Sequence, residues 1–178
     1  MVYIFLADGF EEIEALATLD VLRRAQIEVT TVGIGGGEIT GSHGVTVKAD
    51  ICDDEAVTDG IEMIVLPGGA GTKKLEKSPV VGRFIDYAAA NGLFIGAICA
   101  APSILGHRGL LRGKRAVVSP GYEKELEGAA VMSDSVCEDG NIITANGPGA
   151  SIAFGLALAA KLKGEKAACE VGARMQVK

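Results

Sequence analysis

Cys99 is the residue whose type and position most directly suggest chemistry. It follows the short apolar run Phe94–Ile98 and precedes Ala100-Ala101-Pro102, where small residues and a proline begin a helix. This pattern is typical of a nucleophile elbow, a tight strand-to-helix turn that presents one side chain to a cleft. A thiol beside a helix N-terminus faces unpaired N–H groups, which favour the thiolate. We therefore expect a reactive thiol; the alternative is a buried structural cysteine.

Glu14 is the best candidate for a proton-transfer partner of this thiol. In the predicted helix Glu11–Ala25 it shares a face with apolar residues such as Val21, whereas Glu12 is expected nearer the solvent. Burial would raise the pKa of Glu14 and keep it partly protonated, so that it could act as general acid and base. The alternative is that Glu14, like its neighbours Glu11 and Glu12, only complements the helix dipole.

A pair of glycines offers backbone donors to the same site. Gly68 and Gly69 end the predicted strand Met63–Leu66, and their N–H groups, with that of Ala100, could stabilise an oxyanion. The run from Gly68 to Lys73 fits neither GxGxxG nor GxxxxGK[ST], which argues against a phosphate-binding loop.

Two further segments are candidates to line the cleft. Ser119 and Pro120 follow the end of a short predicted strand, and Gly147 and Pro148 precede a long apolar helix. For Gly147 and Pro148 the alternative is a simple helix start.

The two histidines do not form a Cys–His pair with the thiol. His107 lies eight residues after Cys99, about 12 Å along a helix axis. His43 lies in a predicted edge hairpin and is expected to be a surface residue. The cysteines and histidines show no metal-ligand spacing, so no metal is expected. The remaining cysteines are expected to be structural or incidental: Cys52, Cys137 and Cys169.

Length and composition restrict the class of protein. The 178 residues suit one domain spanning 1–178, and 48% of them are hydrophobic. The net charge of −6 argues against nucleic acid or an anionic membrane as a partner. The apolar runs are too short to span a bilayer, and no targeting segment is visible. Four unclustered cysteines indicate a reducing, cytoplasmic location.

Strands and helices alternate along the chain, which predicts an α/β fold: a mostly parallel sheet with helices on both faces. In such sheets the site lies at the C-terminal ends of the strands, where the glycine pair and the elbow meet. The other predicted strands are Val2–Leu6, Glu28–Ile34 and Ala116–Val118, the hairpins lie within Ile39–Val47 and Ser135–Ala145, and the other helices are Pro79–Ala90, Ala150–Leu162 and Lys166–Arg174.

Five motifs in this order resemble the ThiJ/PfpI superfamily, in its DJ-one branch, along essentially the whole chain. The motifs are Ala7-Asp8-Gly9-Phe10-Glu11-Glu12-Ile13-Glu14, Asp20-Val21-Leu22-Arg23-Arg24-Ala25, Val65-Leu66-Pro67-Gly68-Gly69, Ala97-Ile98-Cys99-Ala100-Ala101-Pro102 and Gly147-Pro148-Gly149. The resemblance implies a flavodoxin-like three-layer sandwich, usually a homodimer. It places the reactive cysteine of the family on Cys99, its partner carboxyl on Glu14 and its substrate-oxygen loop on Gly68-Gly69.

The resemblance also implies a choice of activities. Members of the branch include glutathione-independent glyoxalases, debated deglycases and sensors of oxidative stress, and the glyoxalase chemistry needs no cofactor or metal. Some relatives carry histidine where this chain has Ser119, and peptidase-like members carry it where this chain has Ala100. A Cys–His mechanism, and with it proteolysis, therefore loses support.

The leading hypothesis is an enzyme that converts small 2-oxoaldehydes such as methylglyoxal to 2-hydroxy acids. Cys99 would form a hemithioacetal and Glu14 would move protons. The alternative is a redox sensor or chaperone that acts through oxidation of Cys99. Both hypotheses use the same residues, so the sequence does not separate them.

Overall fold

A seven-stranded sheet forms the middle layer of the computed structural model, which describes residues 1–177. Every neighbouring pair is parallel except the edge pair of β10 and β11, which is antiparallel. The expected mostly parallel α/β sheet is therefore confirmed. Across the sheet the strands are β10 (Val136–Asp139), β11 (Ile142–Ala145), β7 (Phe94–Ile98), β6 (Met63–Leu66), β1 (Val2–Leu6), β2 (Val29–Gly33) and β5 (Ile51–Cys52).

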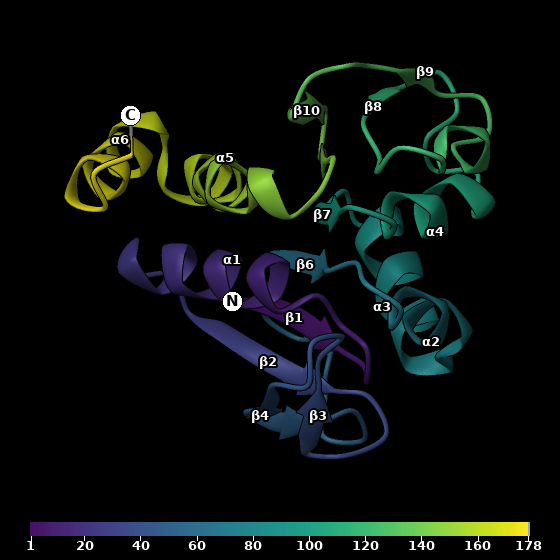
Figure 1. The fold of residues 1–178 in the computed structure, drawn as a ribbon, viewed down its shortest axis with the longest axis vertical. Coiled ribbons are helices and arrows are strands. Elements are labelled where there is room, and N and C mark those ends of the chain that lie inside the picture. The colour runs from purple at the N-terminus through teal and green to yellow at the C-terminus, as the bar shows by residue number, and fades with distance from the viewer. Residues whose placement is uncertain (178) are drawn as a thin grey trace.

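Helices cover both faces of this sheet, which explains why its central strands are apolar without alternation. In Figure 1 one face carries α1 (Glu12–Arg24), α5 (Ser151–Lys163) and α6 (Glu165–Arg174). The opposite face carries α2 (Thr72–Lys77), α3 (Pro79–Ala90) and α4 (Pro102–His107). Each side has its own hydrophobic core, with Phe154 and Leu22 in one and Phe84 and Phe5 in the other. The result is the expected three-layer sandwich.

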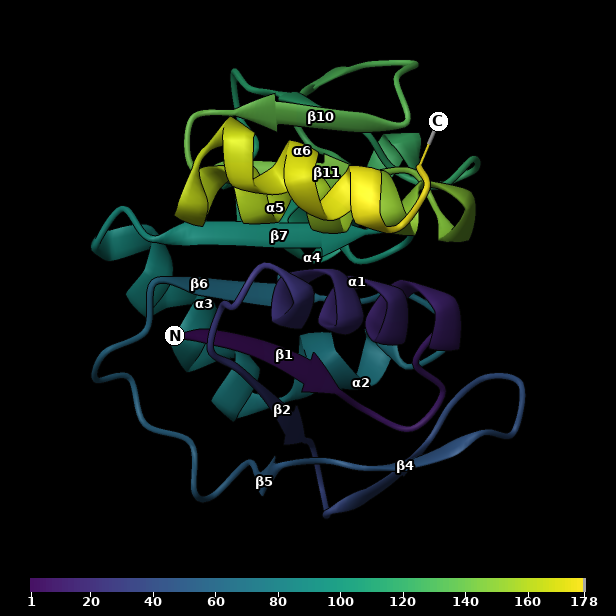
Figure 2. The same cartoon turned by 90° about the vertical axis from the view of Figure 1, so that its left-hand side faces the viewer.

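The two smaller sheets lie outside the central one. The predicted hairpin is present as β3 (Glu38–Thr40) and β4 (Thr46–Lys48), which pair antiparallel; in Figure 2 the chain continues from β4 to β5 at the lower edge of the view. The strand predicted at Ala116–Val118 is shorter and shifted, since β8 (Arg115–Ala116) pairs in parallel with β9 (Ala130–Val131). Two 3-10 turns, Glu123–Glu125 and Pro148–Ala150, complete the described elements.

The buried side of α1 is not purely apolar. Ile13 is 57% exposed, while Thr18 and Glu14 are fully buried. Because α1 packs against α5, its buried side is set by that neighbour and includes polar residues. The six-residue α2 was not predicted, since its only buried apolar side chain is Leu75 and a single residue produces no periodicity.

Candidate active site

Cys99 occupies the strained turn that the elbow pattern predicts. Its φ of 64° lies in the left-handed region, which costs a non-glycine residue about 1–3 kcal/mol. Two backbone hydrogen bonds hold the turn: Cys99 N donates to Ala145 O at 2.8 Å, and Ser119 N donates to Cys99 O at 2.9 Å. The thiol is thus fixed between the end of β7 and the start of α4.

Glu14 is held rigidly in the first turn of α1. The side chain of Glu11 caps this helix, since its Oε2 accepts a hydrogen bond from Glu14 N at 2.7 Å. The Glu14 carboxyl is fully buried, and its Oε2 accepts from Gly68 N at 2.8 Å. Its other oxygen, Oε1, has no hydrogen-bond partner of standard geometry within residues 1–177. One carboxyl oxygen is therefore anchored and the other is available for chemistry.

Gly68 lies against both Cys99 and Glu14. A Cβ at this position would stand 2.6 Å from Cys99 Cβ and 2.7 Å from Glu14 Oε2. Both groups therefore touch the same small volume, which only a glycine leaves empty. The close approach places the carboxyl beside the thiol, as the sequence predicted.

The two acidic groups perturb each other and are both shifted by burial. Burial raises the pKa of Glu14 to about 7; the charge of Glu11 adds to the rise, and contacts with the Cys99 thiol and Gly68 N–H oppose it. Burial, followed by the charge and hydrogen bonding of Glu14, raises the pKa of Cys99 to about 11. Near neutral pH the pair therefore holds one to two protons, and the sulfur keeps its own.

The expectation that a helix dipole favours the resting thiolate is wrong here. Helix α4 starts three residues after Cys99 and has only six residues. The Ser119 hydroxyl and the Ala100 N–H do lower the pKa of the thiol, but burial and the neighbouring carboxylate outweigh them.

The predicted oxyanion donors need one correction. The N–H of Gly68 is already bound to Glu14, so it is not free for a substrate oxygen. The N–H of Gly69 donates no hydrogen bond within residues 1–177, and that of Ala100 faces the sulfur of Cys99. Of the three expected donors, Gly69 N–H is therefore uncommitted within residues 1–177, whereas Ala100 N–H is directed at the Cys99 sulfur in the resting site.

The residues expected to line the cleft are divided by the structure. Ser119 lies against Cys99 through both its backbone and its hydroxyl. Pro120 instead lines a separate cavity of about 270 Å³ together with Asn146. Gly147 and Pro148 lie shortly after Ala145, which binds the Cys99 N–H, and their place in the cleft stays a prediction.

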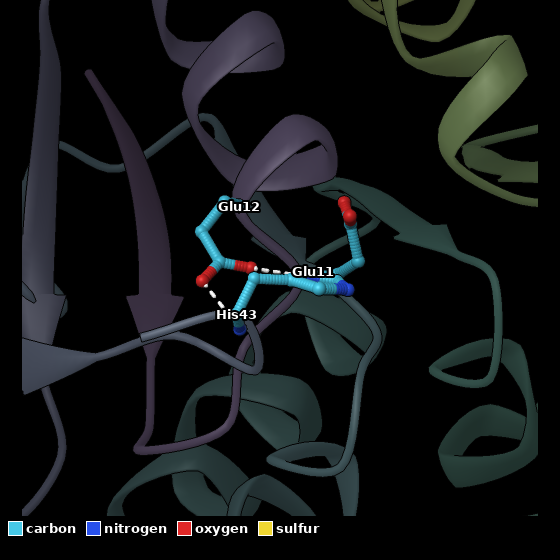
Figure 3. A group of neighbouring side chains, drawn as sticks. All are labelled: Glu11, Glu12 and His43. Atoms are coloured by element: carbon cyan, nitrogen blue, oxygen red, sulfur yellow. Dashed lines mark hydrogen bonds and ion pairs between the residues drawn. The ribbon is translucent and has the colours of Figure 1, made fainter. Parts of the chain in front are cut away.

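Glu12 and His43 form an interaction that sequence reasoning missed. Glu12 was expected nearer the solvent but is 8% exposed. Its Oε1 accepts from His43 N at 2.7 Å and its Oε2 contacts His43 Nδ1 at 2.8 Å, as the dashed lines in Figure 3 show. Glu11 lies close enough for the three side chains to share a cation. The Glu12 oxygens are, however, already satisfied by the hairpin, so the arrangement is a clamp between α1 and the β3–β4 loop.

The remaining sequence expectations concern cysteines and membranes. All four cysteines are free thiols. Among residues 1–177 no helix combines the length and the apolar character needed to cross a bilayer.

Comparisons with known proteins agree with this geometry. The model of the DJ-1/PfpI family matches residues 1–161. Protein dj-1beta of Drosophila melanogaster is 37% identical, over 94% of this chain and 92% of its own. A glutathione-independent glyoxalase of Caenorhabditis elegans is 30% identical, over 86% of this chain and 83% of its own. A deglycase of Pyrococcus abyssi is 31% identical, over 83% and 90% respectively.

Solved structures extend the similarity to the whole fold. A DJ-1 superfamily protein from Salmonella typhimurium superposes with a TM-score of 0.94 at 34% identity, covering 99% of this chain and 98% of its own. The oxidized DJ-1 of Toxoplasma gondii superposes with a TM-score of 0.94 at 31% identity, covering 98% and 97%.

Proposed function

This chain belongs to the DJ-1/PfpI family, and from that premise we propose that it is a glutathione-independent glyoxalase acting on small 2-oxoaldehydes. The observation that carries the proposal is the buried Glu14 carboxyl, with one oxygen anchored by Gly68 and the other free beside the Cys99 thiol. The names of the worm glyoxalase and the archaeal deglycase support an enzyme of this general kind.

The reaction begins with addition of the thiol to the aldehyde. Because the pKa of Cys99 is raised to about 11, the Glu14 carboxylate acts as the base that removes the thiol proton during the attack. The sulfur forms a bond to C1, and the proton passes through Glu14 to the aldehyde oxygen. The product of this step is a hemithioacetal.

Proton transfer from C1 to C2 then completes an internal redox change. Glu14 removes the proton from C1, and the resulting enediolate is stabilised by the N–H groups of Gly69 and Ala100. Return of this proton to C2, with transfer of the C1 hydroxyl proton to the C2 oxygen, gives a thioester that carries a 2-hydroxyl group. C1 is oxidised as C2 is reduced, so the step needs no external electron carrier.

Water then hydrolyses the thioester and restores the Cys99 thiol. The bond between C1 and sulfur breaks, and a 2-hydroxy acid leaves. The overall reaction consumes one 2-oxoaldehyde and one water, and no cofactor enters it.

The test is lactate formation from methylglyoxal without glutathione. The wild type should form lactate, while Cys99→Ser, which keeps the shape but lacks the thiol, should form none. Absence of lactate from wild-type protein with a titratable, reduced Cys99 would contradict the proposal.

A redox-sensing role through Cys99 is the second candidate. The similar Toxoplasma protein is described as oxidized, and a protonated Glu14 could stabilise a sulfinate by hydrogen bonding. Oxidation acts on the thiolate, however, and the raised pKa of Cys99 keeps that form scarce. Peroxide titration followed by intact mass measurement distinguishes the roles, since a sensor gives a stable sulfinate on Cys99.

We also propose that the chain is a homodimer. The apolar side chains of Ile13 and Val45 are at least half exposed on neighbouring elements, since Val45 N lies 3.4 Å from Glu12 Oε1. Light scattering should give twice the mass of one chain, and the mass of a single chain would contradict this.

A further inference from the structure

A second cavity begins at the proposed oxyanion loop. It has a volume of about 320 Å³ and is lined by residues of that loop, of α2, of α4 and of the segment around Tyr122. Gly69 is among the residues that line it. Ser103 also lines the cavity, and its Oγ donates a hydrogen bond to Ala100 O at 2.7 Å. Ala100 is the residue that directly follows Cys99. The cavity therefore adjoins the oxyanion loop and the turn after Cys99, but neither Cys99 nor Glu14 lines it.

The lining of this cavity includes a histidine held between two carboxylates. His107 Nδ1 lies 2.5 Å from Glu76 Oε1, and its Nε2 lies 2.7 Å from Glu125 Oε2. These contacts raise the pKa of His107 and join α2, α4 and the Glu123–Glu125 turn. Each carboxylate keeps its second oxygen without a hydrogen bond within residues 1–177, so both can accept hydroxyl groups.

The charged side chains that line the cavity are equal in number for the two signs when His107 is protonated. Lys73 also lines it and forms no salt bridge within residues 1–177. With a protonated His107 the lining carries two cationic and two anionic side chains. A phosphate or carboxylate tail would meet Glu76 and Glu125, and a cationic tail would meet Lys73 and His107. A neutral tail with several hydroxyl groups meets acceptors and donors without either repulsion, and the exposed phenol of Tyr122 adds a further polar contact.

We propose that this cavity is a subsite for the tail of the substrate, and that the substrates it favours are 2-oxoaldehydes with a neutral, polyhydroxylated chain such as those formed from sugars. The inference rests on the proposed glyoxalase function and refines its substrate class. A volume of about 320 Å³ lies at the lower end of the range for small-molecule pockets, roughly 300–1,000 Å³. The one-carbon tail of methylglyoxal would leave it unfilled.

The first experiment compares two substrates in three proteins. kcat/KM is measured for 3-deoxyglucosone, which has a hydroxylated tail, and for methylglyoxal. Glu125→Leu removes an acceptor from the subsite, whereas Glu123→Leu removes an acidic residue two positions away that does not line it. Loss of one hydrogen bond to a charged group should lower the deoxyglucosone-to-methylglyoxal ratio about tenfold in Glu125→Leu, mainly through KM. Glu123→Leu should keep the wild-type ratio. Equal ratios in all three proteins would overturn the subsite.

A binding measurement separates failure of this inference from failure of the proposed function. In the Cys99→Ser protein, 3-deoxyglucosone should shift the backbone amide resonances of Lys73 and Tyr122, and Glu125→Leu in this background should weaken the binding. Wild-type protein that forms no lactate while these shifts occur would refute the glyoxalase reaction and leave the subsite standing. Lactate formation without any shift at these amides would refute the subsite alone.

Discussion

Glu12 and Glu14 lie in the same turn of α1, both buried, yet their acidities move in opposite directions. Burial raises the pKa of Glu14 from its ordinary value of 4.5 to about 7. Burial also acts to raise the pKa of Glu12, but hydrogen bonds from the side chain and backbone of His43, and from Val45 N–H, lower it to about 2. The two residues thus lie in the same turn of the helix, and their pKa values shift in opposite directions.

The difference lies in the number of donors that each carboxylate meets. Glu12 faces the β3–β4 loop, which supplies several N–H groups to both of its oxygens. Glu14 faces the sheet, where Gly68 supplies a single N–H to one oxygen. A buried carboxyl with many donors becomes a fixed structural anion, while one with few donors titrates near neutral pH and is suited to acid–base catalysis.

The largest effect should come from filling the space between Glu14 and Cys99. Gly68→Ala would place a Cβ 2.6 Å from Cys99 Cβ and 2.7 Å from Glu14 Oε2, so one of the two groups must move. We expect kcat/KM for methylglyoxal to fall at least about 100-fold, since small misplacements of catalytic groups have effects of this size.

The matched control for this variant is Gly36→Ala. A Cβ there meets no atom within 4 Å, and the residue does not have a positive φ. Its activity and thermal stability should equal those of the wild type. If Gly68→Ala retains full activity while remaining folded, the close placement of carboxyl and thiol is not needed for the reaction.

The raised pKa of the buried Glu14 carboxyl should make the free energy of unfolding depend on pH. Because the folded pKa of Glu14 is raised, the folded state binds this proton more tightly than the unfolded state. Its contribution is complete below about pH 4.5 and is lost as the pH rises through about 7. The loss approaches about 3 kcal/mol, from the distance between the two pKa values.

Chemical denaturation at a series of pH values, for wild type and Glu14→Gln, measures this contribution. The wild type should lose stability between mildly acidic and mildly alkaline pH, and Glu14→Gln should lose less. Parallel curves for the two proteins would show that Glu14 titrates at its ordinary pKa.

A smaller effect is expected from substitution of Glu12. Glu12→Gln removes the ion pair with His43 but leaves Glu14 and Cys99 in place. Since the pKa of Glu12 is lowered, its contribution is present above about pH 4.5 and is lost as the pH falls through about 2. At neutral pH the variant should show a Tm lower by about 2–4 °C.

Lactate formation by Glu12→Gln should stay within about twofold of wild type, because Glu12 touches neither reacting group. A large loss of activity without a change in Tm would show that Glu12 takes part in the reaction and does not only stabilise the fold.

Local patterns in the sequence predicted much of the fold and the pairing at the centre of the site. The strands β1, β6 and β7 have the bounds predicted from their apolar runs, and for β6 the run is delimited by Glu62 and Pro67. The elbow at Cys99 is likewise encoded by the small residues around it. The burial of Glu14 follows from its spacing on the helix.

The remainder depends on contacts between distant parts of the chain. The clamp between Glu12 and His43 joins residues 31 positions apart, and no periodicity of α1 indicates it. The engagement of Gly68 N–H by Glu14 spans 54 positions. The pKa of Cys99 is raised by burial and by Glu14, which long-range contacts place beside the thiol. The position of Cys99 next to a helix N-terminus, taken alone, predicts a shift in the opposite direction.

The most direct test of the account is the pH profile of lactate formation by wild type and Glu14→Gln, measured from about pH 5 to about pH 9 without glutathione. The account predicts that wild-type kcat/KM rises with pH to a plateau, with a midpoint near the raised pKa of Glu14 of about 7. Glu14→Gln, with its Cys99 thiol intact, should be at least about 100-fold slower and show no such rise. Full activity in Glu14→Gln, with the same midpoint as the wild type, would contradict the role of Glu14 as the general acid and base.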